Sequence, residues 1–287
     1  MTQYDLLALT CNSKEQIEDV ILLEQKCKQH DQINISAGIE HLVKENGDKG
    51  LLCYYNNEMI GLLSWYTSDG ISANINGMVN PDYRRQRVFS SLLTRAKEDI
   101  KKQGIQKLIY RVHSGSLSGL KYVEYLGAEF DRSEYLMQLS RLPSYKYSRD
   151  CGLLIYSMQP QDFEFVISCS SLAFGDSEAW TREYFTKTNE PNRTTYIALS
   201  NHERVGLIRI NHLNDTTSII HDFCVHPSYQ GNGIGKEILL NTVEKLLEEG
   251  YTNIKLSVVT ENHHALNLYR NVGFEVTSEL QYFIGTL

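Results

Sequence analysis

The sequence predicts a mixed α/β protein made of two consecutive units that share one fold. The chain has 287 residues, which is enough for two domains of ordinary size. Its second half repeats its first half at a nearly constant spacing. Within the second half, short β-branched apolar runs alternate with segments of helical periodicity, as expected for a sheet covered by helices.

The internal repeat keeps one spacing over most of each half. The segment MVNPDYRRQRVFSSLL (78–93) aligns with CVHPSYQGNGIGKEIL (224–239), which begins 146 residues later. Gly104 and Gly250 fall at the same spacing. Coincidental matches among turn residues would scatter over many spacings, so we interpret the repeat as a tandem duplication. We predict domains at 1–143 and 150–287.

The two predicted domains are joined by RLPSYKYSRD (141–150), which is polar and contains proline as linkers do. The second domain opens with LLIYSM (153–158), a short strand, and with a helix started by Asp162. Two β-branched runs, TTYIALS and RVGLIRINHL, are split by the turn NHE and favour a hairpin. TSIIHDFCV (217–225) predicts the next strand.

The rest of the second domain predicts two helices between strands. Apolar residues from Ile234 to Glu249 recur at helical spacing, and Gly250 follows as a residue that ends helices. NIKLSVV predicts a strand, HHALNLYRNV a short helix ending at Gly273, and FEVTSELQYFIG the last strand or strands. The order β-α-β-β-β-α-β-α-β is that of a mixed sheet with flanking helices.

Three alternating glycines, Gly231, Gly233 and Gly235, lie between a predicted strand and the helix that follows it. The first turn of a helix has unpaired N–H groups that attract phosphate oxygens, and glycine lets a ligand approach the backbone closely. Lys236 adds positive charge beside them. The spacing fits neither a Walker loop nor a GxGxxG dinucleotide fingerprint, and a turn that only connects two elements needs fewer glycines. The loop therefore predicts pyrophosphate binding.

Two motifs resemble those of the GCN5-related N-acetyltransferase (GNAT) superfamily. Residues 230–235, QGNGIG, match its [RQ]xxGx[GA] signature, and ENHHALNLYRNVGFE (261–275) is similar to its second cofactor motif. The resemblance implies two tandem GNAT-like domains, each a mixed, mostly antiparallel sheet with a splayed parallel strand pair and flanking helices. It also implies transfer of an acetyl group from acetyl-CoA to an amine by direct attack. The resemblance does not specify the acceptor, which we expect to be a primary amine of a small molecule, with a peptide N-terminus as the alternative.

The resemblance further implies which residues bind acetyl-CoA. Backbone groups of 223–225 would bind the pantetheine arm, amides of 231–236 the pyrophosphate, and Asn262 the cofactor's other side. The N–H of Val225 would stabilise the oxyanion of the tetrahedral intermediate. The full predicted set is Phe223, Cys224, Val225, Gln230, Gly231, Asn232, Gly233, Ile234, Gly235, Lys236 and Asn262.

Two residues are predicted to take part in catalysis. Tyr269 matches the superfamily's tyrosine near the sulfur, although it also suits packing on an apolar helix face. A phenol is a poorer acid than the thiol that would form if it protonated the leaving thiolate, so we expect Tyr269 to hydrogen-bond the sulfur. Strand alternation puts His221 on one face with Phe223 and Val225, where it would act as base or be satisfied by a neighbouring loop. Asp222 is expected to be structural.

The first domain departs from the motif at each chemical position. When the two halves are aligned at the spacing of 146 residues, the first half keeps the residues that shape the fold. The residues expected to bind the cofactor or to react are replaced. The resulting hypothesis is a degenerate, non-catalytic domain in residues 1–143, in which Arg84, Arg85 and Arg87 leave residual anion binding open. The replacements are Arg87 for Gly233, Phe89 for Gly235, Ser116 for Asn262, Val123 for Tyr269 and Ile75 for His221.

Composition excludes several other classes. A net charge of −7 argues against nucleic acid as a partner. No stretch resembles a signal peptide or a membrane span, so we expect a cytoplasmic protein. We also expect a monomer or a homodimer. The alternative function is a non-catalytic acyl-CoA-binding regulatory or interaction protein. Cysteine spacing predicts free thiols and no metal site for Cys11, Cys27, Cys53, Cys151, Cys169 and Cys224.

Overall fold

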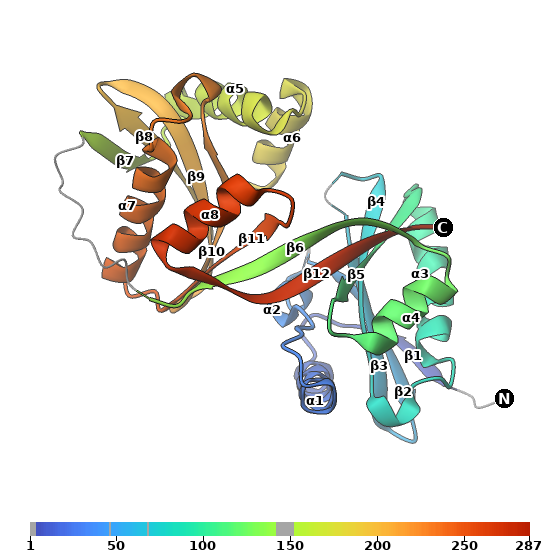
Figure 1. Cartoon of the computed structure of the whole chain (residues 1–287). Coiled ribbons are helices and arrows are strands. Elements are labelled where there is room, and N and C mark those ends of the chain that lie inside the picture. Colours follow the sequence, from blue (N-terminus) through green and yellow to red (C-terminus); the bar gives the residue numbers. More distant parts are fainter. Residues whose placement is uncertain (1–3, 46, 68, 142–151) are drawn as a thin grey trace. The chain divides into compact units, whose positions relative to one another are not determined.

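The computed structural model describes residues 4–45, 47–67, 69–141 and 152–287, and it has the predicted mixed α/β architecture (Figure 1). The chain forms two compact units. Unit 1 comprises Met1–Ser133 and Ser278–Leu287, and unit 2 comprises Glu134–Thr277. Most of the predicted linker, residues 142–150, and Cys151 lie outside the described residues.

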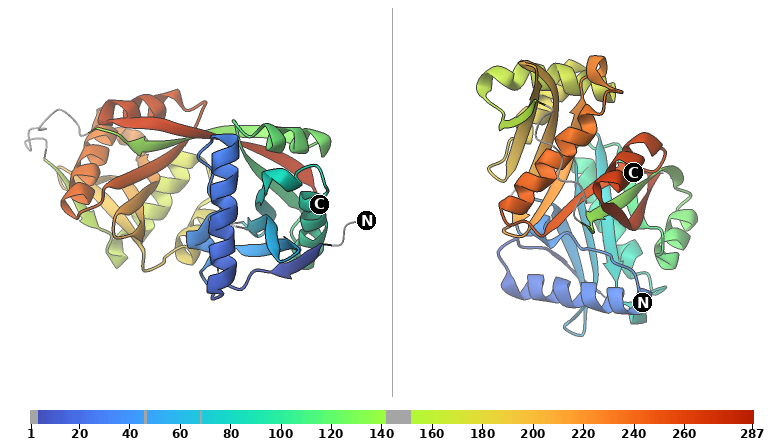
Figure 2. Two further views of the ribbon diagram at one scale, coloured as in Figure 1. Left: turned by 90° about the horizontal axis from the view of Figure 1, so that it is seen from below. Right: turned by 60° about the vertical axis from the view of Figure 1, so that its left-hand side comes forward.

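Unit 1 is a sheet in the order β1-β2-β3-β4-β5-β12, in which only β4 and β5 are parallel. The long helix α1 packs on one face of this sheet, and α3 and α4 pack on the other (Figure 2). The elements are β1 (Asp5–Ala8), α1 (Lys14–Asp31), α2 (Ile39–Leu42), β2 (Lys49–Tyr55), β3 (Glu58–Tyr66), β4 (Ser72–Val79), η1 (Pro81–Tyr83), α3 (Val88–Lys102), β5 (Lys107–His113) and α4 (Leu117–Tyr125).

Unit 2 repeats this plan in the order β6-β11-β10-β9-β8-β7, with β10 and β11 as its parallel pair. Helices α5 and α6 cover one face, and α7 and α8 cover the other. The elements are β7 (Leu153–Ser157), η3 (Pro160–Asp162), α5 (Phe163–Phe174), α6 (Glu178–Lys187), β8 (Arg193–Ser200), β9 (Glu203–Asn214), β10 (Thr217–Val225), η4 (Pro227–Tyr229), α7 (Ile234–Glu248), β11 (Asn253–Val259) and α8 (His263–Val272).

The two halves of the sequence exchange their last strands. Strand β6 (Glu129–Leu139) follows α4 in the chain, yet it pairs with β11 of unit 2. Strand β12 (Phe274–Thr286) follows α8, yet its residues 280–286 pair with β5 of unit 1. The limits of the compact units therefore fall inside these two strands, whereas the predicted limits at 143 and 150 describe the sequence repeat.

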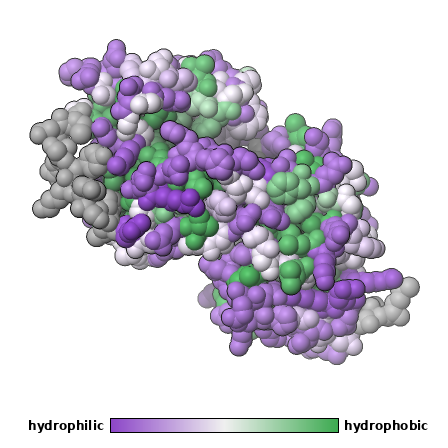
Figure 3. Space-filling model, in the orientation of Figure 1, coloured by the Kyte–Doolittle hydropathy of each residue, from purple (hydrophilic) through white to green (hydrophobic). Residues whose placement is uncertain are grey.

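The surface mixes polar and apolar side chains. On the face seen in Figure 3, hydrophilic residues surround smaller apolar patches. Scattered apolar groups of this kind are usual on folded domains. None of the helices in the described residues is long and apolar enough to cross a membrane.

Candidate functional site

Strands β10 and β11 pair along only part of their lengths. Their parallel pairing ends at Ile220 opposite Leu256, while β10 continues to Val225 and β11 to Val259. On its other edge, β11 remains paired with β6 as far as Val259. The two parallel strands therefore separate after Ile220, which produces the predicted splay in unit 2.

A β-bulge in β10 lies where the strands separate. The register between β10 and β9 shifts between His221 and Cys224. Between them, Asp222 has a φ of 44°. This is the left-handed backbone region, which residues other than glycine, asparagine and aspartate seldom adopt. An inserted residue of this kind reverses the alternation of side chains along a strand.

The bulge changes which residues share a face of the sheet. Phe223 and Val225 pack against the core under α7 and α8. His221 instead lies opposite Arg209 of β9, and the Arg209 guanidinium stacks over the Phe185 ring on the α5–α6 face. Directly paired residues of neighbouring strands share a face. The prediction that His221 shares a face with Phe223 and Val225 is therefore wrong.

A polar network around the buried Arg209 holds the bulge. The Tyr184 hydroxyl donates to both carboxylate oxygens of Asp222, at 3.3 and 3.2 Å. The Arg209 Nη1 atom lies 3.5 Å from Asp222 Oδ2, and the guanidinium donates to Thr188 Oγ1 and to the Thr188 carbonyl, both at 2.7 Å. Burial, with the nearby Asp222 charge, raises the pKa of Tyr184 to about 12. Asp222 thus has the structural contacts expected of it.

The glycine loop between β10 and α7 adopts a conformation that favours glycine. Gly231 and Gly233 have φ values of 81° and 80°, and Gly233 is the N-cap of α7. Apart from the adjoining residues, no atom of the described chain lies within 4 Å of the position that a Cβ would take at either glycine. The constraint at these two positions is therefore the backbone conformation, and the space beside the loop is open.

Five consecutive amides at the start of α7 are without acceptors. The N–H groups of residues 231–235 make no hydrogen bond to any described part of the chain. Lys236 and Glu237 already donate to the Gly233 carbonyl, at 3.0 and 3.3 Å. The Lys236 amide is thus occupied, and the predicted set of amides at 231–236 is reduced to five. Such a row of N–H groups binds anions.

Two side chains of the predicted cofactor set brace this loop. The Gln230 side-chain amide donates to the Val225 carbonyl at 3.0 Å, which ties the loop to the end of β10. The Asn232 side-chain amide lies 3.3 Å from the carbonyls of both Tyr229 and Gln230. These bonds fix the backbone course from the strand to the helix.

The loop, the end of β10 and α8 come together on the α7–α8 face. A Cβ at Gly235 would lie 3.5 Å from Val225 Cγ2, 3.6 Å from Leu268 Cδ2 and 3.7 Å from Phe223 Cζ, all ordinary contacts. The rings of Phe223 and Tyr269 are 6.5 Å apart. The structure therefore gathers most of the predicted cofactor and catalytic residues in one region, with His221 on the opposite face.

Helix α8 supplies two of the predicted residues. Tyr269 is 8% exposed, packs edge-on against Phe274, and has its pKa raised to about 12 by burial. Asn262 is exposed and caps α8, because its side-chain oxygen accepts from the Ala265 amide at 3.1 Å. The contribution of Asn262 that the structure shows is therefore to the start of this helix.

Unit 1 keeps the backbone plan of this site. Strands β4 and β5 pair only from Ser72 to Ile75, after which β4 continues to Val79. In the equivalent loop, Arg85 and Arg87 have φ values of 66° and 65°. The loop thus retains the left-handed residues of its counterpart although glycine is absent.

The side chains of unit 1 nevertheless fill this region. The Phe89 ring lies against the backbone of β4, so that a Cβ at Gly77 would be 2.1 Å from Phe89 Cε2. Phe89 also packs edge-on against Tyr122, with centroids 5.0 Å apart. Arg84 is paired with Asp31 through two 2.7 Å hydrogen bonds. The position that Gly235 holds in unit 2 is thus occupied by a phenylalanine in unit 1.

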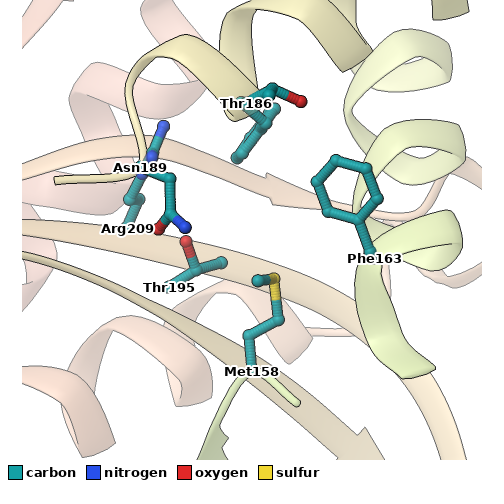
Figure 4. Close-up of a pocket in the computed structure, with 7 residues that line it drawn as sticks. Met158, Phe163, Thr186, Asn189, Thr195 and Arg209 are labelled. Atoms are coloured by element: carbon teal, nitrogen blue, oxygen red, sulfur yellow. The ribbon is translucent and has the colours of Figure 1, made fainter. Parts of the chain in front are cut away.

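A cavity of about 240 Å³ opens in unit 2 on the α5–α6 face (Figure 4). Its lining residues come from separate strands and helices and form no sequence motif, so they are not recognisable from the sequence. Arg209 is the one charged residue among them. The lining residues are Met158, Phe163, Phe185, Thr186, Asn189, Thr195 and Arg209.

The described residues contain no cluster of three or more side chains suited to a metal ion. The five described cysteines are free, and four of them are buried. Cys169 and Cys224 approach most closely, with Sγ atoms 3.8 Å apart between α5 and β10. The contact with Cys169, together with burial, raises the pKa of Cys224, which keeps this thiol protonated.

Comparisons with known proteins agree with this geometry. Residues 156–274 match the model of the acetyltransferase (GNAT) family. The fold is similar to that of a GCN5-related N-acetyltransferase from Sphaerobacter thermophilus, with a TM-score of 0.80 and 17% identity over 99% of this chain and 95% of that one. It is also similar to a tandem GNAT protein from the clavulanic acid biosynthesis pathway, with a TM-score of 0.76 and 15% identity over 99% and 98%. These likenesses confirm the predicted fold class.

Among curated proteins, the mycothiol acetyltransferase of Brachybacterium faecium is 27% identical over 222 residues, which are 71% of this chain and 65% of that protein. The chain spans less than two thirds of the length of five curated relatives that it matches, from 34% to 65% of each. The likeness to each of them is therefore to a part of that protein.

Proposed function

Since the chain belongs to the GCN5-related N-acetyltransferase (GNAT) superfamily, we propose that it is an acetyl-CoA-dependent N-acetyltransferase with its active site in unit 2. The acceptor is a primary amine of a small molecule, and the amine attacks the thioester directly. Catalysis belongs to the C-terminal domain predicted at 150–287, and the domain predicted at 1–143 has no catalytic role.

The observation that carries this proposal is the difference between two equivalent sites. Both units have a splayed parallel strand pair that leads to a helix N-terminus. In unit 2 the loop beside it has five amides with no acceptor in the described residues and open space at Gly231 and Gly233. In unit 1 the Phe89 ring lies on the corresponding strand. A coenzyme fits the first arrangement, whereas in the second its pantetheine arm would meet an aromatic ring at the strand end.

The residues of unit 2 have separate tasks in this reaction. The amides of 231–235 hold the diphosphate, and the backbone of 223–225 at the splayed strand end holds the pantetheine arm. The Val225 N–H donates to the thioester oxygen as charge develops on it. As the new N–C bond forms and the C–S bond breaks, the acceptor nitrogen loses a proton to His221, the proposed base, and the thiolate leaves.

Tyr269 acts on the leaving group by hydrogen bonding. Burial raises the pKa of its phenol to about 12, whereas an ordinary thiol titrates near 8.5. Full proton transfer from the phenol to the thiolate is therefore uphill by roughly 5 kcal/mol. A hydrogen bond from the neutral phenol stabilises the developing thiolate without this transfer.

Replacing Gly235 by phenylalanine tests the proposal, because it recreates in unit 2 the side chain of unit 1. Acetyl-CoA binding is measured by calorimetry on the full chain, and transfer is measured as release of the CoA thiol with a panel of amines. Gly235→Phe should weaken binding at least tenfold, about 1.4 kcal/mol. Gly235→Ala is the matched control, since its Cβ meets only ordinary contacts and should leave binding almost unchanged.

Two results would contradict this function. Wild-type protein that does not bind acetyl-CoA would exclude the cofactor. Tight binding without CoA release for any amine of the panel would favour the alternative, a non-catalytic acyl-CoA-binding protein.

A further inference from the structure

The cavity of unit 2 has the size of a small ligand group. Its volume is about 240 Å³, below the roughly 300–1,000 Å³ typical of sites for drug-sized ligands. Strand β8, α6 and the segments around them contribute its walls (Figure 4). A cavity of this volume suits a single amino-acid-sized molecule.

The cavity lies next to the place where the parallel strands separate. Thr195 of β8 is directly opposite Arg209 of β9, and Arg209 is directly opposite His221 of β10. His221 follows Ile220, the last residue of β10 that pairs with β11. A molecule in the cavity is therefore one strand away from the start of the splay and on the α5–α6 face. The cofactor loop and Tyr269 lie on the α7–α8 face.

The lining residues combine an apolar wall with one cation. Met158, Phe163 and Phe185 supply apolar surface, and no carboxylate lines the cavity. An acceptor with a second positive charge, such as a polyamine, would have to leave water without gaining an anionic partner there. The wall instead suits an apolar side chain on a molecule with a single amine.

Arg209 has unused capacity to bind an acceptor group. It is only 2% exposed, and its Nε–H has no hydrogen-bond partner in the described part of the chain. Its one ion pair in the same residues, with Asp222, is at 3.5 Å, beyond the usual length of a charge-assisted hydrogen bond. Burial lowers the pKa of Arg209, and the positive charge of nearby Arg193 lowers it further. A buried N–H without an acceptor is costly, and a ligand oxygen would satisfy it.

We propose that the acceptor is an α-amino acid with an apolar side chain and a free carboxylate, and this rests on the acetyltransferase function proposed above. Its side chain lies among Met158, Phe163 and Phe185, and its carboxylate accepts from Arg209. The amine then points toward the splay between β10 and β11. The carboxylate, rather than the amine, distinguishes this acceptor from other primary amines.

Matched substrates test the proposal on the wild-type full chain. Release of the CoA thiol is followed with leucine and phenylalanine, with their carboxamides, and with a diamine. The carboxamides keep the side chain and the amine, and they lose only the negative charge. We expect kcat/KM for the free acids to be at least tenfold higher than for the carboxamides, and the diamine to be the poorest acceptor. Equal or faster turnover of the carboxamides or the diamine would overturn the proposal.

A cavity-filling variant gives a second readout. Thr195→Leu places a larger side chain beside Arg209 and should raise the KM for the amino acid at least tenfold while leaving acetyl-CoA affinity unchanged. Thr194→Leu is the matched control, because Thr194 pairs with Ile210 and faces away from Arg209. Equal effects of the two variants on this KM would contradict the assignment of the cavity.

Direct binding separates the failure of this proposal from the failure of the enzymatic function. Calorimetry with phenylalanine is carried out on the protein saturated with acetyl-CoA. If acetyl-CoA binds but amino acids neither bind nor are acetylated, the acceptor assignment is wrong and the cofactor site stands. If acetyl-CoA itself does not bind, the enzymatic function is wrong.

Discussion

Tyr269 lies between the Phe223 and Phe274 rings and has little contact with water. Tyr269→Phe should lower kcat by roughly ten- to a hundredfold, because it removes one hydrogen bond to a developing charge. Affinity for acetyl-CoA should stay nearly constant, since the ring and its packing remain. Single-turnover kinetics and calorimetry measure the two quantities. An unchanged kcat would show that Tyr269 serves packing alone.

The pH profile provides a further check on Tyr269. Its pKa is raised to about 12, so the phenol remains protonated throughout an assay between about pH 6 and pH 10. Activity should therefore rise with pH as the acceptor amine loses its proton, without an alkaline decline caused by Tyr269. The Phe variant should show the same profile at a lower level. A decline near pH 9 that disappears in the variant would contradict the raised pKa.

His221 is exposed on the α5–α6 face, directly opposite Arg209. That face also carries the cavity, so His221 remains the proposed base on the acceptor side. His221→Gln should lower kcat/KM at least tenfold, because it removes the imidazole proposed to accept the proton of the acceptor amine. Steady-state kinetics at a saturating concentration of acetyl-CoA measure this change. A variant with the wild-type kcat/KM would exclude His221 as the base.

At the scale of single residues, the sequence predicted the loop better than the strand. Gly231 and Gly233 were identifiable because they alternate with Gly235 before a helix, where glycine lets a ligand approach the backbone closely. The face of His221 was not predictable, because Asp222 adopts the left-handed conformation without a glycine to signal it. Arg209 was missed because its burial depends on α6, which is remote from β9 in the sequence.

At the scale of elements, the bulge of β10 depends on the Tyr184–Asp222–Arg209 network. Asp222→Asn would leave the buried Arg209 without a carboxylate, and breaking such a pair typically costs about 3–5 kcal/mol. Asp222 is partly exposed, so we expect a loss near the lower end of that range in the free energy of unfolding. Acetyl-CoA affinity should also fall, because the backbone of 223–225 would lose its fixed course.

Urea unfolding and calorimetry measure these two effects, and Tyr184→Phe is the matched variant. It removes the hydroxyl that donates to Asp222 but keeps the ion pair with Arg209, so its effect on unfolding should be about 1 kcal/mol. If both variants bind acetyl-CoA like the wild type, the network does not control the strand end.

Element order was predictable from periodicity, and the exchange of strands was not. The second half has the predicted order from β7 to β12 with α6 added after α5, because apolar runs and glycine stops define these elements locally. Which sheet edge receives β6 and which receives β12 depends on pairings between residues more than 100 positions apart. Both edges belong to duplicated units with similar strands, so local pattern gives no preference.

At the scale of the whole molecule, strand exchange makes each compact unit depend on both halves of the sequence. The fragment 1–143 lacks β12 and would leave the β5 edge at Lys107–His113 unpaired. The fragment 150–287 lacks β6 and would leave the β11 edge at residues 255–259 unpaired. Unpaired edges of this length lose a ladder of hydrogen bonds and invite association with other strands.

We therefore expect each fragment alone to unfold at a lower temperature than the full chain or to aggregate, and the two mixed fragments to recover a complex with acetyl-CoA binding. Thermal unfolding and size-exclusion chromatography measure this. A full chain cut by a protease site inserted at 141–150 is the control, because it retains all strands and should remain associated. The opposite result is a soluble 150–287 fragment that binds acetyl-CoA with wild-type affinity. In that case β12 would take the place of β6 beside β11, and the exchange would stabilise the protein without being needed for its site.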